Sequence, residues 1–195
     1  MASLNNKGIE KRNNGMPLDL DLIKGIRINR SAVERRAATL GTRRSVKKEW
    51  QAAWLLKVIS CMDLTSLGGD DTPGNVLRLS AKARQPVRQD ILSALEMTDV
   101  NLKVAAVCVY HNLIETALEA LKGSSIPIAA VSTGFPAGQI TMEQKLMEIE
   151  RSVQAGAEEI DIVISRAHVL RGDWKALYEE VQLFRKTCGD AHMKA

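Results

Sequence analysis

The strongest chemical signal in this sequence is a single carboxylate inside an apolar segment. Asp161 lies within the run GAEEIDIVI, residues 156–164, whose β-branched residues predict a strand covered on both faces. A carboxylate in such a strand is costly unless hydrogen bonds, a cation or a function accounts for it. Buried carboxylates with shifted pKa values concentrate at active sites, so Asp161 is a candidate acid or base. The alternative is an aspartate near a strand end that caps a neighbouring loop or helix.

A lysine between apolar neighbours is the natural cation for this carboxylate. Lys194 lies in the final stretch HMKA, which begins another predicted strand. Burial lowers the pKa of a lysine, while a nearby carboxylate restores its charge. A lysine–carboxylate group suits carbonyl chemistry, with the lysine as electrostatic partner or imine-former and Asp161 as proton shuttle. A structural ion pair is the alternative. Because Lys194 stands near the chain end, we expect solvent to keep its pKa near the reference value of about 10.4.

Further polar side chains occur at the C-terminal ends of the predicted strands. They are Asp63 and Thr65 after the first strand, Cys108 and Tyr110 on the second, and Ser132 and Thr133 at the end of the third. In parallel α/β folds these ends, with the loops beyond them, form the ligand-binding face. The segment STGFPAGQ, residues 132–139, could offer backbone N–H groups to an anion, although a segment of this composition is usually only a turn.

Short apolar strands alternate with helices over most of the chain. We expect strands at 58–62, 104–110, 126–132, 160–164 and from 192 onward, and helices at 74–83, 89–95, 113–121, 142–155 and 173–187. This alternation predicts βαβ units and a parallel α/β sheet. The sequence contains no dinucleotide-binding glycine motif after the first strand and no P-loop motif. Two architectures stay open on periodicity, a doubly wound sheet and a (β/α)₈ barrel.

The N-terminal part of the chain differs from the rest. We interpret residues 1–17 as a flexible tail, residues 18–56 as a basic helical extension, and residues 57–195 as the α/β part. Trp50 and Trp54 have the spacing of one helix face, which predicts that both rings lie in the core.

Basic charge is concentrated at the same end. Residues 1–50 hold 12 Lys and Arg against 5 Asp and Glu, whereas residues 51–195 hold 15 against 18. The run RRSVKK, residues 43–48, could be a nuclear address or a phosphate-contacting patch, but such a run is more often the solvated face of a helix.

Composition narrows the function classes. No apolar run reaches the roughly 18 residues of a membrane span, and the N-terminus lacks the apolar region of a secretory signal. Cys61, Cys108 and Cys188 are widely spaced without a CxxC pair, which indicates reduced cytoplasmic thiols rather than a disulfide frame or a metal site. The aromatic content of 4% gives little support to stacking on single-stranded nucleic acid.

Several phrases together resemble one enzyme family. The segments WQAAWLLKVISCMDLTSLGGDDT, VAAVCVY, STGFPAGQ, GAEEIDIVISR and RGDWKALYEEV closely resemble the deoxyribose-phosphate aldolase family in its animal-type form, from about residue 30 to residue 195. The family is a class I aldolase on a TIM barrel. The resemblance therefore implies a lyase that cleaves 2-deoxy-D-ribose 5-phosphate to acetaldehyde and D-glyceraldehyde 3-phosphate through a lysine Schiff base, with no cofactor and no metal.

Site residues carry over from the resemblance by position. Asp161 resembles the proton-relay aspartate on the fourth strand, and Lys194 resembles the active-site lysine on the fifth. Asp63, followed by Thr65, matches the first-strand aspartate of the substrate site, and Cys108 matches the second-strand cysteine beside the substrate. His111 departs from the proline that bacterial relatives have after the tyrosine.

The family's Schiff-base lysine is absent from the printed sequence. In the family it lies on the sixth strand, within a phrase like IKTSTG, and a second lysine on the seventh strand lowers its pKa. Glycine-rich loops after the last two strands hold the phosphate. A TIM barrel typically needs about 250 residues, and this chain supplies about four βα units and the start of a fifth. We therefore expect an N-terminal half-barrel that is inactive alone.

The resemblance also sets the expected partners and location. We expect a small-molecule sugar phosphate as substrate, no membrane or nucleic-acid partner, and a cytoplasmic location, with the nucleus as the alternative. A homo-oligomer is compatible with the sequence. Two other function classes stay open, a non-catalytic half-barrel interaction module with open strand edges, and an anion- or nucleic-acid-binding protein that uses the basic N-terminal segment.

Overall fold

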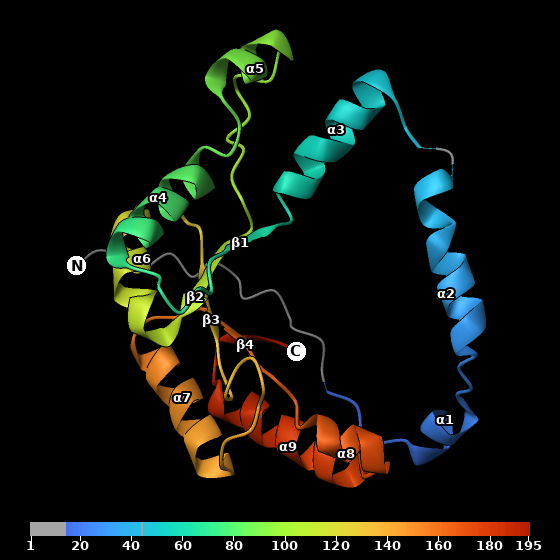
Figure 1. The fold of residues 1–195 in the computed structure, drawn as a ribbon. Coiled ribbons are helices and arrows are strands. Elements are labelled where there is room, and N and C mark those ends of the chain that lie inside the picture. Colours follow the sequence, from blue (N-terminus) through green and yellow to red (C-terminus); the bar gives the residue numbers. More distant parts are fainter. Residues whose placement is uncertain (1–14, 44) are drawn as a thin grey trace. The chain divides into compact units, whose positions relative to one another are not determined.

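The computed structural model describes residues 15–43 and 45–195 (Figure 1). Residues 1–14 of the expected tail and position 44 of the basic run lie outside the described residues. The chain divides into two compact units, Met1–Gly41 and Thr42–Ala195. Each unit is described by itself below.

The first unit contains two short helices. They are α1 (Leu20–Gly25) and α2 (Arg30–Ala38), and the short 3-10 turn η1 (Leu40–Thr42) follows them. The side chains of Asp19 and Asn29 cap these helices by accepting backbone N–H groups of the first turn. Neither helix has a buried residue, so helical propensity and capping rather than a core account for this unit.

The second unit is built on one parallel sheet. Its strands are β1 (Asp63–Thr65), β2 (Ala106–Tyr110), β3 (Ile128–Val131), β4 (Glu159–Asp161) and β5 (His192–Lys194). They lie in the order β1-β2-β3-β4-β5, and every neighbouring pair is parallel. The parallel α/β sheet predicted from the sequence is therefore confirmed, and its strands are neighbours in chain order.

Two predicted strands are displaced in the structure. Residues 58–59, which we expected in the first strand, belong to helix α3 (Lys48–Ile59), and the strand begins at Asp63. The fourth strand is shorter than predicted and ends at Asp161. Beyond it the Val163 N–H donates to the Thr133 side chain instead of to a neighbouring strand. Asp161 thus lies at a strand end, as the alternative interpretation had it, although its contacts are not those of a cap.

Helices follow each of the first four strands. They are α4 (Pro73–Arg84), α5 (Gln89–Ala94), η2 with α6 (His111–Leu113 and Ile114–Leu121), α7 (Met142–Gln154), α8 (Arg166–Arg171) and α9 (Trp174–Thr187). Thr141 and Gln144 form a capping box at the start of α7. Gly156 follows the end of this helix with φ of 102°, a conformation that favours glycine.

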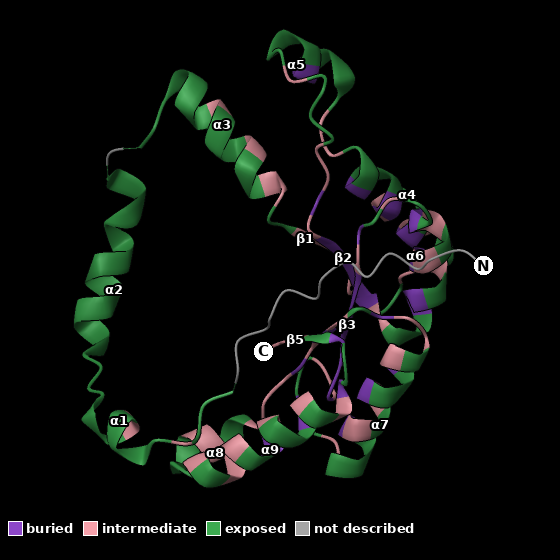
Figure 2. Ribbon diagram, turned by 180° about the vertical axis from the view of Figure 1, so that it is seen from behind, coloured by how far each residue is buried: buried purple, intermediate pink, exposed green. Residues whose placement is uncertain are grey.

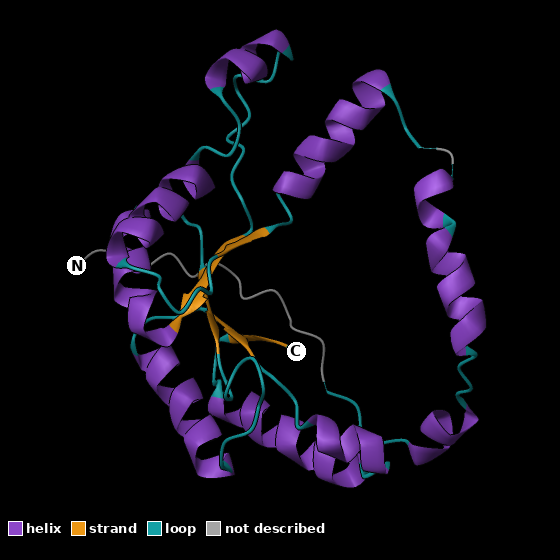
Figure 3. Ribbon diagram, in the orientation of Figure 1, coloured by secondary structure: helices purple, strands orange, loops and turns teal. Residues whose placement is uncertain are grey.

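The two faces of the sheet have different neighbours. Val107 and Val109 point into the large core, which also contains Val76 of α4, Ile114 of α6, Ile149 of α7 and Phe184 of α9. The alternate residues Ala106 and Cys108 belong to a small separate cluster with Ala129 and Val131. In the described part of the second unit, these covering helices therefore share one face of the sheet (Figure 3).

The sheet is strongly curved. Neighbouring strands lie about 4.8 Å apart, so a flat sheet would separate β1 from β5 by roughly 19 Å. The Lys194 ammonium on β5 nevertheless contacts the Asp63 carboxylate on β1. The two outermost strands must therefore curl toward each other around the helix-free face. Sequential parallel strands, helices on the outside and this curvature make the unit a partial (β/α)₈ barrel rather than a doubly wound sheet.

Helix α3 contradicts one prediction. Trp50 and Trp54 are 67% and 59% exposed rather than buried in a core, and most of α3 is coloured as exposed in Figure 2. Leu55 and Val58 on the same helix are also exposed. Spacing predicted an apolar helix face correctly, but no described element of the second unit covers this face.

The described helices are too short or too polar to span a membrane.

Candidate active site at the carboxyl edge of the sheet

The strand register places the predicted site residues on one face. Thr65 pairs with Cys108, and Asp161 pairs with Lys194. Laterally paired residues in a parallel sheet point to the same side. Cys108 belongs to the cluster on the face that the helices leave open. The sequence-predicted residues therefore converge on the concave face. Thr65, Asp161 and Lys194 end their strands, whereas Asp63 begins β1 rather than following it, and Cys108 lies within β2.

Lys194 is the centre of an ionic cluster. Its Nζ donates to Asp63 Oδ2, lies 3.0 Å from Glu159 Oε2 and lies 3.2 Å from Asp161 Oδ1. The predicted contact between Lys194 and Asp161 is therefore confirmed. Three carboxylates surround one ammonium, so the four groups carry a formal excess of two negative charges.

Glu159 is a site residue that the sequence reasoning missed. It lies two positions before Asp161 on β4, so both side chains point to the concave face. The period-two alternation of the strand contained this signal. Because Glu158 and Glu159 are charged, the strand was predicted to begin at Ile160, and Glu159 was therefore placed outside it.

The environment of Lys194 overturns the expectation of an ordinary pKa. Burial opposes the charge, but hydrogen bonds to Asp63 and Glu159 and the charge of Asp161 together raise the pKa of Lys194 above 10.5. The side chain is only 32% exposed, so solvent does not dominate. The position of Lys194 near the chain end did not predict its pKa, because carboxylates of β4 and β1 contact its ammonium.

Asp161 bridges this cluster to a thiol. Its Oδ2 accepts from Cys108 Sγ at 3.6 Å, while its Oδ1 faces Lys194 without a directed hydrogen bond. Burial, followed by the charge of Asp161 and this hydrogen bond, raises the pKa of the Cys108 thiol to about 12. Cys108 is therefore a neutral donor at physiological pH. Asp161 has one oxygen at a cation and one at a weak donor, which suits a group that accepts and returns protons.

Replacing Asp161 with Asn is expected to make Cys108 more reactive. The substitution removes a negative charge beside the thiol, so the Cys108 pKa falls from its raised value and the thiolate fraction rises between pH 9 and about 12. Alkylation by iodoacetamide at about pH 9 should accelerate by about tenfold for each unit of lowered pKa. Site-resolved mass spectrometry measures the rate, with exposed Cys61 as internal control. An unchanged Cys108 rate in a folded variant would show that the carboxylate does not act on the thiol.

The other polar residues from the strand ends lie outside the Lys194 cluster. The Thr65 hydroxyl donates to the Asp63 carbonyl at 3.1 Å, and no described contact joins Thr65 to Lys194. Ser132 is buried and its hydroxyl has no partner among the described atoms. The Tyr110 ring meets the Phe135 ring edge-on, with centroids 6.1 Å apart, beside the cluster that contains Cys108. An apolar wall thus adjoins the charged groups.

The loop 132–139 already uses two of the N–H groups that an anion would need. Gly134 N–H donates to Glu148 Oε2 at 2.8 Å, and Gly138 N–H donates to the Gly134 carbonyl at 2.7 Å. A carboxylate of α7 and a carbonyl of the loop itself accept these two N–H groups, so the loop is an ordered turn in this structure. The simpler of the two interpretations of this segment is the one the contacts support.

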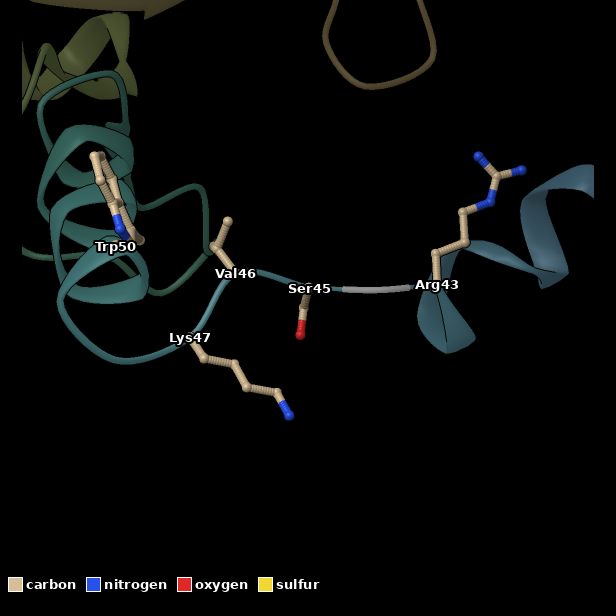
Figure 4. A pocket seen from close by; sticks show the side chains of 5 residues that line it. All are labelled: Arg43, Ser45, Val46, Lys47 and Trp50. Carbon is tan, nitrogen blue, oxygen red and sulfur yellow. The ribbon is translucent and has the colours of Figure 1, made fainter.

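The basic segment before α3 lines a shallow hollow of about 760 Å³. Its side chains are those of Arg43, Ser45, Val46, Lys47 and Trp50. Figure 4 shows the side chains of Arg43 and Lys47 pointing in different directions. The cations do not converge, so this hollow lacks the geometry of an anion site. In the described residues, no group of three His, Cys, Asp or Glu side chains is arranged to hold a metal ion.

Comparison with known sequences gives the family context for this geometry. The family model described as DeoC/LacD family aldolase matches residues 57–195. Deoxyribose-phosphate aldolase of Bos taurus is 54% identical over 182 residues, which cover 92% of this chain and 57% of that protein. The protein of the same name from Homo sapiens is 53% identical over 184 residues, 93% of this chain and 58% of its own length. The chain thus spans a little more than half the length of these relatives.

Solved structures agree on the fold. A crystal structure from Coccidioides immitis, of a protein proposed to be a deoxyribose-phosphate aldolase, has a TM-score of 0.58 and 23% identity, covering 71% of this chain and 48% of that chain. The aldolase QR15 has a TM-score of 0.56 and 19% identity, covering 70% and 53%. At these identities the likeness concerns the fold, and it agrees with the partial barrel.

Proposed function

Because the chain belongs to the DeoC/LacD family of aldolases, we propose that it forms the N-terminal part of a deoxyribose-phosphate aldolase. The proposed reaction is the reversible cleavage of 2-deoxy-D-ribose 5-phosphate to acetaldehyde and D-glyceraldehyde 3-phosphate. The sequence identity of 54% with the bovine enzyme and 53% with the human enzyme supports this substrate.

One observation of the structure carries the proposal. Asp161 stands between the Lys194 ammonium and the Cys108 thiol on the concave face of a parallel sheet. A retro-aldol cleavage through an imine needs protons moved to and from the substrate, and a carboxylate with a neighbouring cation can do so. The excess negative charge around Lys194 favours a cationic intermediate such as a protonated imine.

Each residue has a distinct proposed role. Asp161 is the proton donor and acceptor, and Lys194 is a supporting active-site lysine that pairs with the surrounding carboxylates. Asp63, Thr65 and Cys108 contribute to the substrate side of the site. Imine formation itself is assigned to a lysine on the sixth strand, as the resemblance implies. Lys194 is protonated and ion-paired, so it is poorly suited to attack a carbonyl.

The test uses a chimera that supplies the remaining strands. Residues 1–195 are joined to the C-terminal part of the bovine relative that follows the matched region; this protein is called the chimera below. We expect the chimera to release acetaldehyde from 2-deoxy-D-ribose 5-phosphate, measured by coupled oxidation of NADH with alcohol dehydrogenase. The bovine enzyme is the positive control. A folded chimera that leaves the substrate intact would count against the proposed function.

Self-association is the proposed consequence of the exposed α3 face and the sheet edges. Trp50 and Trp54 are exposed, and β1 and β5 each have one neighbouring strand in the described sheet. Uncovered apolar surface and unpaired strand edges both favour association. We therefore propose that the 195-residue chain forms homo-oligomers.

Charged substitutions on α3 are expected to shift this equilibrium. The double variant Trp50→Glu, Trp54→Glu removes two large apolar contacts and should move the sedimentation distribution of the chain toward monomer. Gln51→Glu is the matched control, because it adds a charge to the same exposed helix without removing apolar surface. Identical distributions for the double variant and the parent chain would rule out α3 as the contact.

We propose a cytoplasmic location for the protein. The wide spacing of Cys61, Cys108 and Cys188, without a CxxC pair, supports this location, because this cysteine usage is typical of a reducing compartment.

A further inference from the structure

Two buried charges lie behind the active-site face. Lys145 of α7 and Glu180 of α9 are each 2% exposed, and Lys145 Nζ lies 2.9 Å from Glu180 Oε1. Lys145 also stands over the Phe184 ring, 5.8 Å from its centroid. Taking two charges out of water is costly, and a well-packed apolar pair is often as stable or more stable. Core packing alone therefore does not account for this pair.

The pair binds the backbone of the segment that follows Asp161. Glu180 Oε2 accepts the Ser165 N–H at 2.8 Å, and Glu180 Oε1 accepts the Ser165 hydroxyl at 2.6 Å. Lys145 Nζ contacts the same hydroxyl at 2.7 Å. Burial opposes ionisation of Glu180, but the hydrogen bonds from Ser165 and Lys145 outweigh it and lower the pKa of Glu180 below 4.5. An ionised carboxylate is a strong acceptor for the Ser165 amide, which no apolar side chain could replace.

Other bonds fix the same segment between Asp161 and Ser165. Ile162 N–H donates to the Lys194 carbonyl at 2.9 Å, and Val163 N–H donates to Thr133 Oγ1 at 2.6 Å. Thr133 is fully buried and has φ of 61°, an unusual conformation for a β-branched residue. The chain after Asp161 is thus held by β5, by the loop after β3 and by α9.

Small displacements of Asp161 would break its contacts. Its carboxylate must stay near Lys194 at 3.2 Å and near Cys108 at 3.6 Å. Catalytic groups need positions fixed within about 0.5 Å. A loosened segment 162–165 would let the end of β4 turn, and the carboxylate would leave one of its two partners.

We propose that Glu180, paired with Lys145, is a positioning residue that holds Asp161 in place through Ser165. Its catalytic consequence rests on the proposed aldolase function, whereas its geometric consequence can be measured in the chain itself. Glu180 does not touch the reacting groups and acts only through the segment after Asp161.

The main variant replaces both charges together. Lys145→Met with Glu180→Leu removes the acceptor of the Ser165 amide while keeping the volume and leaving no buried lone charge. The matched control is Lys175→Met with Glu179→Leu. This exposed ion pair lies entirely on α9, and the residue changes are the same. Both are made in the 195-residue chain and in the chimera.

Two readouts in the 195-residue chain test the proposal without any activity assay. Amide exchange at Ser165, followed by NMR, should accelerate about 10- to 100-fold, as expected for a lost hydrogen bond to a charged group. Cys108 alkylation at about pH 9 should also accelerate, because the Asp161 carboxylate no longer stays beside the thiol. The control pair should change neither.

In an active chimera, kcat should fall by about tenfold or more while KM changes less, since misplaced acid–base groups slow the chemical step.

Faster Ser165 exchange with unchanged Cys108 alkylation would overturn the proposal, because the pair would then stabilise the loop without affecting the position of Asp161. Unchanged values of both would overturn it as well. If the double variant does not fold, the isosteric Glu180→Gln variant is read by the same two signals. An inactive chimera bears only on the proposed function, because both readouts are taken in the 195-residue chain.

Discussion

Replacing Asp161 with Asn in the chimera is expected to lower turnover by roughly 10²–10⁴-fold, the usual contribution of general acid–base catalysis. Asparagine keeps the shape of the side chain but can neither accept nor return a proton. It also removes one of the three negative charges that hold Lys194. Steady-state kinetics on 2-deoxy-D-ribose 5-phosphate measure the loss, which should appear in kcat more than in KM.

The stability of this variant should change only modestly. Lys194 keeps Asp63 and Glu159 as partners, so no ammonium is left uncompensated. Glu158→Gln is the matched control on the same strand segment, because Glu158 is exposed. If Asp161→Asn lowers the melting temperature strongly while the folded fraction turns over at the parent rate, Asp161 is part of a structural ion pair.

The polypeptide of residues 1–195 alone is expected to form no borohydride-trapped adduct with 2-deoxy-D-ribose 5-phosphate, whereas the chimera should form one. Imine formation requires a neutral amine. Lys194, the lysine of the ionic cluster, is held as an ammonium by three carboxylates. Lys145 is buried and paired with Glu180. The printed sequence contains no phrase like IKTSTG, which carries the Schiff-base lysine in the family.

Intact mass spectrometry after reduction distinguishes the two proteins. The chimera with its sixth-strand lysine changed to methionine is the control, and it should resemble the 195-residue chain. An adduct on Lys194 of the 195-residue chain, with turnover of substrate, would contradict the prediction. It would assign imine formation to the fifth strand.

Much of the site could be predicted from the sequence because its signals are local. An aspartate within apolar β-branched residues marked Asp161, and a lysine between apolar neighbours marked Lys194. Alternation of short strands and helices predicted a parallel sheet, and consecutive strands are most often neighbours in such a sheet. These features depend on residues close together in the chain, where period and composition are informative.

Predictions failed where the boundary of an element, or the burial of a side chain, depended on residues far away in the sequence. Residues 58–59 are as apolar as a strand but continue α3. Trp50 and Trp54 form an apolar face, and nothing local reveals whether another element covers it. The same limit applies to Lys145, whose burial beside Glu180 depends on how two helices pack against the loop after β4.

The sequence by itself determined the βαβ pattern, the likeness to an aldolase family and the pairing of Asp161 with Lys194. Only the tertiary structure decided that the sheet curls, that Asp63 and Glu159 share the same lysine, and that Lys194 is therefore more basic than usual. Lys194 and Asp63 are 131 positions apart in the chain. Curvature is the sum of small twists over five strands, and no local period records where such a sum brings two distant side chains together.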